Sequence, residues 1–227
     1  MWKLVSGVMV TLCLAIGLAS VGTAAPSSAL GGECPPSATS GPASPNPPAA
    51  ISSRTKMPRV PAGELVACVG ASAIDGATLD HWMRAAWLTT RSLRRHPKLR
   101  ALAEPALNFL IQALWITGEA SALGVSLSTA EVHAEYVKQR RRQFPHRGEF
   151  DAFLRSSGFT VNDLLLRVRV DMLSSRITQH VLAGRHGKQA IQALARFVKR
   201  FKLTWVSQTY CTPALRVEIC GHRLPAS

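Results

Sequence analysis

Histidine, cysteine and acidic side chains are the residues of this chain that could bind a metal or transfer a proton. The seven histidines are scattered along the chain. His133 and Glu135 do not share a helix face, and the six-residue spacing of His180 and His186 is poor for two metal ligands on one helix. The sequence contains no H-E-x-x-H, C-x-x-C or G-x-S-x-G motif and no glycine-rich phosphate loop. We therefore expect no catalytic residue, no metal site and no cofactor, although a triad dispersed along the chain would leave no such motif.

The most conspicuous local motif is the basic run KQRRRQFPHR at residues 138–147. Lys138, Arg140, Arg141 and Arg142 are candidates for contacting an anionic polymer. The same cations would also be favoured by the helix dipole at a helix C-terminus, so a solvated helix end remains an alternative. Only Phe144 lies among them, whereas proteins that bind single strands interleave several aromatic rings with the cations. We therefore expect no specific nucleic-acid partner.

The whole chain is strongly basic. It has 27 Lys and Arg against 13 Asp and Glu, a formal net charge of +14 at pH 7. Such an excess favours acidic partners, which include nucleic acid, an anionic membrane surface and the phosphate polymers of a cell envelope. Charge alone does not choose among them.

The N-terminal third has the composition of a targeting segment followed by a linker. Residues 1–25 combine Lys3 with an uncharged apolar run at 4–21 and small residues before Ala24, which predicts a signal peptide cleaved after Ala24 or, alternatively, a retained membrane anchor. Residues 26–62 are rich in Pro, Ser and Ala and predict a disordered linker. The chain is thus expected to be exported to the envelope or secreted, with a folded domain at 63–227.

Export permits disulfides, and four cysteines lie beyond residue 25. Cys211 and Cys220 are close together in a tail that looks irregular and helix-free, so we expect a disulfide between them. Cys68 lies in an apolar run and is expected to be a small buried residue. Cys34 follows Glu33, where a lipoprotein signal needs a small residue, so lipidation is not expected. The pairing of Cys34 and Cys68 stays open.

Helical patterns fill the chain after residue 76 and predict a mainly α fold of about six helices. A short pair of extended segments in ELVACVGASAID precedes them. The capping boxes Ser128-x-x-Glu131 and Thr160-x-x-Asp163 mark two of the helix starts, and Pro105 in a first turn marks another. The expected helices span residues 77–94, 105–124, 129–143, 149–157, 161–183 and 188–205.

Two of these helices have informative faces. The helix at 105–124 has no charge between residues 106 and 116, so we expect it at the centre of the core. The last helix has apolar residues at spacings of three and four, which predicts one packed stripe opposite a solvated basic face. The packed stripe comprises Ile191, Leu194, Val198, Phe201 and Trp205.

Several segments resemble the N-terminal helical module of the SurA and PrsA-type extracytoplasmic folding factors. In GVSLSTAEVHAEYVKQRRRQFPHRGEFDAFLRSSGFTVNDLLLRVRVDMLSSRI, a hydroxyl-rich turn leads into an "AEV" helix, followed by a short Phe-centred helix and a G-x-T-x-x-x-L turn into a long Arg-bearing helix. VACVGASAIDGATLDHWM, FLIQALWITGEASALGVS and the two-cysteine tail WVSQTYCTPALRVEIC are similar to other parts of that module. The resemblance covers residues 65–227 and implies a SurA N-terminal-like helical domain with a disulfide-closed tail.

One departure from the family concerns its enzymatic domain. Relatives carry a parvulin prolyl isomerase domain between the long helix and the last helix, where this chain has only AGRHGK. We therefore expect no isomerase activity. The resemblance implies an ATP-independent chaperone, or holdase, for unfolded or nascent exported polypeptides.

Four aromatic residues are candidates for contacting such a polypeptide: Trp87, Phe144, Phe150 and Phe153. Two other interpretations remain open at this point. The chain could be a basic envelope module that binds anionic polymers or nucleic acid, or a structural relative of the folding factors that only supports a membrane complex.

Overall fold

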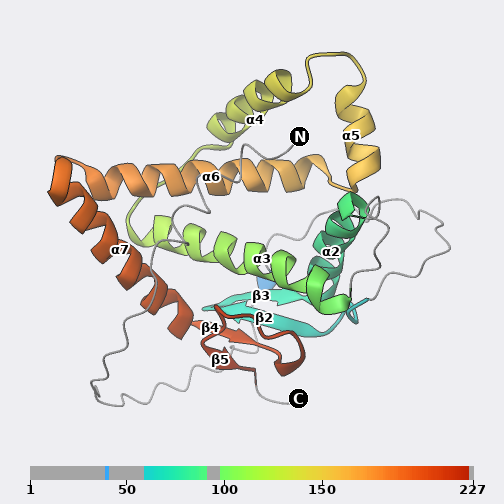
Figure 1. The fold of residues 1–227 in the computed structure, drawn as a ribbon, viewed down its shortest axis with the longest axis horizontal. Coiled ribbons are helices and arrows are strands. Elements are labelled where there is room, and N and C mark those ends of the chain that lie inside the picture. Colours follow the sequence, from blue (N-terminus) through green and yellow to red (C-terminus); the bar gives the residue numbers. More distant parts are fainter. Residues whose placement is uncertain (1–38, 41–58, 91–97, 225–227) are drawn as a thin grey trace.

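The structure is a computed structural model that describes residues 39–40, 59–90 and 98–224. This part of the chain is mainly helical, as predicted, with six α-helices and a small sheet (Figure 1). The helices are α2 (Gly76–Thr90), α3 (Leu99–Ala122), α4 (Thr129–Gln143), α5 (Glu149–Ser157), α6 (Val161–Leu182) and α7 (Gly187–Ser207). The strands are β1 (Thr39–Ser40), β2 (Leu65–Val69), β3 (Ser72–Asp75), β4 (Thr209–Cys211) and β5 (His222–Arg223), and a 3-10 helix, η2, spans Pro213–Leu215.

Residues 1–25 and most of the predicted linker lie outside the described residues, so the signal or anchor at 4–21 stays a prediction. Within the described ranges, none of the helices is both long and apolar enough to cross a membrane.

Local signals set several helix ends. Ser128 accepts a hydrogen bond from the N–H of Glu131, and the Glu131 carboxylate accepts one from the N–H of Ser128, which confirms the first capping box. Thr160 and Asp163 form the second in the same way. Gly158 ends α5 with a φ of 72°, a conformation that glycine adopts without the strain of a Cβ. The bounds predicted for α4 and α5 are confirmed.

The predicted start of α3 is wrong. The helix begins at Leu99, so Pro105 lies inside it rather than in its first turn. Proline removes the bond that its N–H would donate to the carbonyl of Ala101, but Ala101 and Pro105 are both exposed, so water can solvate that carbonyl. Leu102 and Ala103, on the opposite side, are buried. Burial of this extra turn outweighs the missing bond.

The sheet has the order β1-β3-β2-β4-β5. β2 and β3 are the predicted pair of extended segments, and they form a hairpin that turns at Gly70 with a φ of 55°. The tail is not irregular as predicted, because β4 pairs antiparallel with β2 and η2 follows it. The Cys211–Cys220 disulfide is confirmed, with an S–S distance of 2.02 Å. Cys68 is fully buried in β2 and is itself disulfide-bonded.

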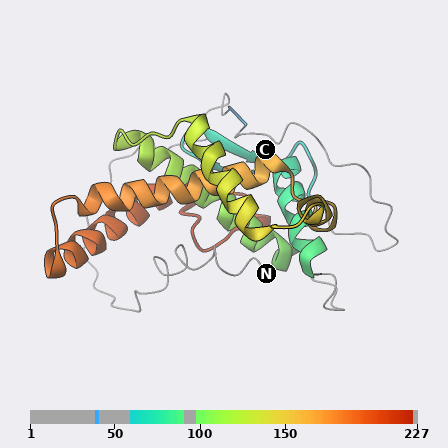
Figure 2. The same ribbon diagram turned by 90° about the horizontal axis from the view of Figure 1, so that it is seen from above.

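Two apolar clusters form the core, and α3 takes part in both. One lies between α2, α3 and the sheet and includes Trp82, Leu107, Ile111 and Trp115. The other lies where α3, α4, α5 and α6 meet. Figures 1 and 2 show α6 running across α3 on the side opposite the sheet, and α7 returning from the far end of α6 towards β4. The central place predicted for α3 is confirmed.

The packed stripe predicted on α7 is wrong at its first position. Ile191 is 70% exposed, and Ala193 and Phe197 are the residues that α7 buries. The first turns of α7 lie beside the last turns of α6, at the end of α7 opposite the one that leads into β4 (Figure 1). Too few elements meet there to cover Ile191.

Candidate functional site

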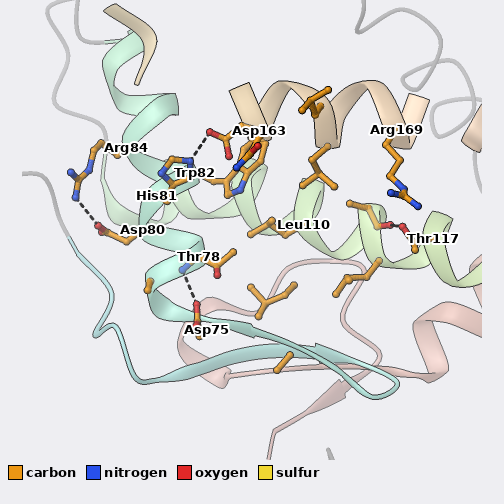
Figure 3. A pocket seen from close by; sticks show the side chains of 18 of the residues that line it. Asp75, Thr78, Asp80, His81, Trp82, Arg84, Leu110, Thr117, Asp163 and Arg169 are labelled. Atoms are coloured by element: carbon orange, nitrogen blue, oxygen red, sulfur yellow. Dashed lines mark hydrogen bonds and ion pairs between the residues drawn. The ribbon is translucent and has the colours of Figure 1, made fainter. Parts of the chain in front are cut away.

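A groove of about 1220 Å³ lies between α2, α3, β3 and the first turns of α4 and α6 (Figure 3). The short segment at residues 59–62 completes one wall. Pockets for drug-sized ligands measure roughly 300–1000 Å³. The groove therefore has room for a ligand larger than a typical small molecule.

The floor of the groove is apolar and rigidly held. Trp82 from α2, Leu110 from α3 and Ile74 from β3 all line it, and all three are buried members of the sheet-side core. Leu165 and Leu166 extend the apolar wall along α6. Because these side chains belong to packed elements, the apolar surface exists before any ligand arrives.

A pair of polar side chains, the half-buried His81 and the buried Asp163, joins two walls of the groove. Nε2 of His81 on α2 lies 2.8 Å from Oδ2 of Asp163 on α6. The same carboxylate oxygen accepts hydrogen bonds from the N–H and the hydroxyl of Thr160. Burial raises the pKa of Asp163, but the hydrogen bonds from His81 and Thr160 together outweigh it, so the pKa lies below its ordinary value. Asp163 is thus a carboxylate that caps α6 and attaches it to α2.

A second group of polar side chains lies on α2 and the end of β3. Asp75 accepts a hydrogen bond from the N–H of Thr78 at 2.7 Å, which caps the start of α2. Nη2 of Arg84 donates a hydrogen bond to Oδ2 of Asp80 at 3.3 Å. Its Oδ1 atom is buried and has no hydrogen-bond partner within the described residues. Figure 3 shows these side chains at the edge of the groove, away from Leu110.

The groove does not bring together the parts of a nucleophilic site. Three threonines supply its hydroxyl groups, Thr78, Thr117 and Thr129, and within the described residues none of them is hydrogen-bonded to His81. Thr117 donates instead to the carbonyl of Ala113 in its own helix. Nor do residues 59–90 and 98–224 contain a group of three His, Cys, Asp or Glu side chains that could hold a metal. What this arrangement can do is bind an apolar ligand and orient it through a few polar groups at the edge.

The aromatic residues predicted to contact a peptide lie elsewhere. Phe144, Phe150 and Phe153 pack on one another, with ring centroids 5.5 Å apart for Phe144 and Phe150 and 5.1 Å apart for Phe144 and Phe153. They belong to the cluster between α4, α5 and α6. Trp87 is half-buried against the sheet-side core. None of the four lines the groove, and their role in peptide binding stays a prediction.

The predicted anion contacts lie along the last turns of α4. Lys138 is exposed and 3.5 Å from Glu135, and the guanidinium of Arg140 lies 4.5 Å from the centre of the Phe150 ring. Arg141 and Arg142 are exposed. Their contact with an anionic polymer stays a prediction.

Sequence reasoning did not find the groove. Its lining comes from five elements and a connecting segment, and His81 and Asp163 are 82 residues apart. The signals that were visible were local: Trp82 reads as a core residue, and Asp163 reads as a helix cap. Neither indicates that α2 and α6 line the same groove.

Comparison with protein-family models found no match, and comparisons with curated proteins and with solved structures found no similar protein. The site is therefore interpreted from its geometry.

Proposed function

We propose that this protein is an exported, ATP-independent chaperone that holds extended apolar segments of unfolded polypeptides in the groove, without prolyl isomerase activity. The observation that carries the proposal is a groove of about 1220 Å³ whose floor is made of core side chains such as Trp82, Leu110 and Ile74. An unfolded chain exposes apolar side chains that have lost their own core, and an apolar groove removes them from water.

The edge of β3 supports an extended conformation for the bound segment. Ala73, Ile74 and Asp75 line the groove. β1 pairs in parallel with the first half of β3, through Thr39↔Ser72 and Ser40↔Ala73. The chain's own β1 occupies the first half of this edge, so an unfolded client would pair with the remaining part, beside Ile74 and Asp75, and add backbone hydrogen bonds to its apolar contacts. Such bonds do not depend on the side chains of the client, which suits a chaperone for many sequences.

The polar side chains at the edge of the groove favour reversible binding. The hydrogen bonds of Asp75, His81 and Asp163 are made within the protein, so these three side chains add no strong polar contact to a client. Affinity then comes from apolar contacts that are individually weak. A client can leave without energy input when it folds and buries the same side chains.

The proposal is tested by adding the protein to an unfolded, aggregating client and following light scattering at low and at moderately high salt. We expect aggregation to be suppressed at near-stoichiometric ratios in both conditions. Suppression that disappears with salt would instead favour the alternative function, binding of anionic polymers through charge. An absence of suppression at both salt concentrations would overturn the chaperone proposal.

A pair of variants tests whether the groove is the site. Ala77 is exposed and lines the groove at the start of α2, so Ala77→Trp would partly fill it. Ala152 is exposed on α5 and does not line the groove, so Ala152→Trp is the matched control. We expect Ala77→Trp to weaken suppression about tenfold and Ala152→Trp to leave it unchanged. Equal effects of the two variants would place the binding site elsewhere.

A further inference from the structure

The C-terminal helical hairpin carries a one-sided charge. Asp171 is followed by no Asp or Glu until Glu218, a stretch that covers the second half of α6, all of α7 and β4. α7 itself has five cations: Lys188, Arg196, Lys199, Arg200 and Lys202. All five are exposed, and none of them forms an ion pair within the described residues. The outer side of α7 is therefore positive and unneutralised.

Two large apolar side chains stand on the same outer side. Ile191 is 70% exposed and Leu203 is 64% exposed. At about 100° per residue, Ile191, Lys188, Lys199 and Lys202 fall within roughly a quarter of the helix circumference, and Leu203 flanks them. The inner side is occupied, because Ala193 and Phe197 are buried against α6 and Trp205 donates a hydrogen bond to Glu119.

We propose that the outer face of α7, formed by Lys188, Ile191, Lys199, Lys202 and Leu203, docks the protein on the surface of an anionic lipid bilayer. Cations close to such a surface are attracted by its negative potential, while apolar side chains enter the boundary between headgroups and acyl chains. The combination of isolated apolar side chains with unpaired lysines is what favours lipid. A phosphate polymer would use the lysines but would gain nothing from Ile191 and Leu203.

The position of this face leaves the groove free. α7 contributes no side chain to the groove, which is lined by α2, α3, β3, α4 and α6. α7 forms one border of the molecule in Figure 1, with α6 and α3 between it and the α2 side. Docking through α7 would therefore hold the protein at a membrane with its groove open. The docking proposal does not depend on which ligand the groove binds.

The test compares the full chain with variants of it, using phosphatidylcholine vesicles with and without phosphatidylglycerol in a co-sedimentation assay. The apolar run at residues 4–21 is the same in every variant and can contact both kinds of vesicle. The readout is therefore the ratio of the affinity for vesicles with phosphatidylglycerol to the affinity for vesicles without it. The α7 variant is Lys188→Glu/Lys199→Glu/Lys202→Glu. The control is Lys138→Glu/Arg141→Glu/Arg142→Glu, which makes the same change in net charge at exposed positions of α4.

We expect the α7 variant to lose at least roughly 100-fold in affinity for the anionic vesicles, since each of the three lost cations contributes about a fivefold factor and the three added carboxylates are repelled by the surface. The control should lose less than about threefold. A third variant, Ile191→Ser/Leu203→Ser, should weaken vesicle binding about tenfold and leave binding to inorganic polyphosphate unchanged. Equal losses in the two charge variants, or vesicle binding that is indifferent to the serine pair, would overturn the proposal, and the second result would indicate a polyanion site.

Discussion

Nε2 of His81 lies 2.8 Å from Oδ2 of Asp163, and this contact connects the middle of α2 to the first turn of α6 across one end of the groove. Asp163 also caps α6 through Thr160. One carboxylate therefore fixes where α6 begins and how far it stands from α2. The width of the groove at this end depends on that residue.

Replacing this carboxylate should cost more than losing an ordinary cap. Asp163→Ala removes the cap and leaves the half-buried ring of His81 without its partner, so we expect the free energy of unfolding to fall by about 2–3 kcal/mol. Ser128→Ala removes the cap of α4 at an exposed site and should cost about 1 kcal/mol. Urea unfolding of both variants makes the comparison. Equal losses would mean that the contact with His81 contributes nothing.

Asp171 should make stability depend on pH. Burial raises the pKa of Asp171 to about 6 from an ordinary value of 3.8, although the positive charge of Arg167 partly opposes the shift. Between these two values the folded protein binds a proton that the unfolded chain does not, so the stability from this group is present at pH 4 and is lost as the pH rises past 6. Because the carboxyl is partly solvated, we expect about 1–2 kcal/mol rather than the full value of the shift.

The measurement is urea unfolding of the natural chain and of Asp171→Asn at pH 4.5 and pH 7.5. The variant cannot bind the extra proton, so the stability of the natural chain relative to the variant should be greater at pH 4.5. A difference that is the same at both pH values would contradict the raised pKa of Asp171.

Gly118 on α3 is required by a close approach to Trp205. A Cβ at Gly118 would overlap the indole ring of Trp205, whose Nε1 donates a hydrogen bond to Glu119 at 2.9 Å. Glycine to alanine inside a helix ordinarily stabilises by up to about 1 kcal/mol. Here we expect Gly118→Ala to destabilise by about 2–3 kcal/mol, because the ring must move and the buried Glu119 loses its partner. Thermal unfolding gives the sign directly, and a stabilised variant would show that the ring can move without cost.

A second disulfide should connect the N-terminal segment to β2. Cys68 is disulfide-bonded, and Cys211 and Cys220 are bonded to each other, which leaves Cys13 and Cys34, both outside the described residues. Cleavage after Ala24 would remove Cys13. We therefore predict a Cys34–Cys68 bond. The position of Thr39–Ser40 agrees with it, because only β3 lies between these residues and the strand that contains Cys68. Mass spectrometry of unreduced peptides from the purified protein should find it, and a free thiol on Cys34 would exclude it.

How much of the fold was predictable depended on the range of the interactions involved. The starts of α4 and α6 and the end of α5 follow from residues within one turn, namely the two capping boxes and Gly158, and the structure agrees with each. The Cys211–Cys220 bond is similarly local. The start of α3 was missed because the burial of Leu102 and Ala103, a tertiary effect, outweighs the local effect of Pro105.

The sequence by itself determined the helical class, most helix limits, the central place of α3 and the basic character of the chain. Tertiary structure decided the rest. The groove exists only because β3, α2, α3, α4 and α6 surround one space, and Ile191 is exposed because it lies on the side of α7 that faces away from α6. Helix caps and turns depend on residues a few positions apart, whereas a groove and an uncovered face depend on distances between elements that no local pattern encodes.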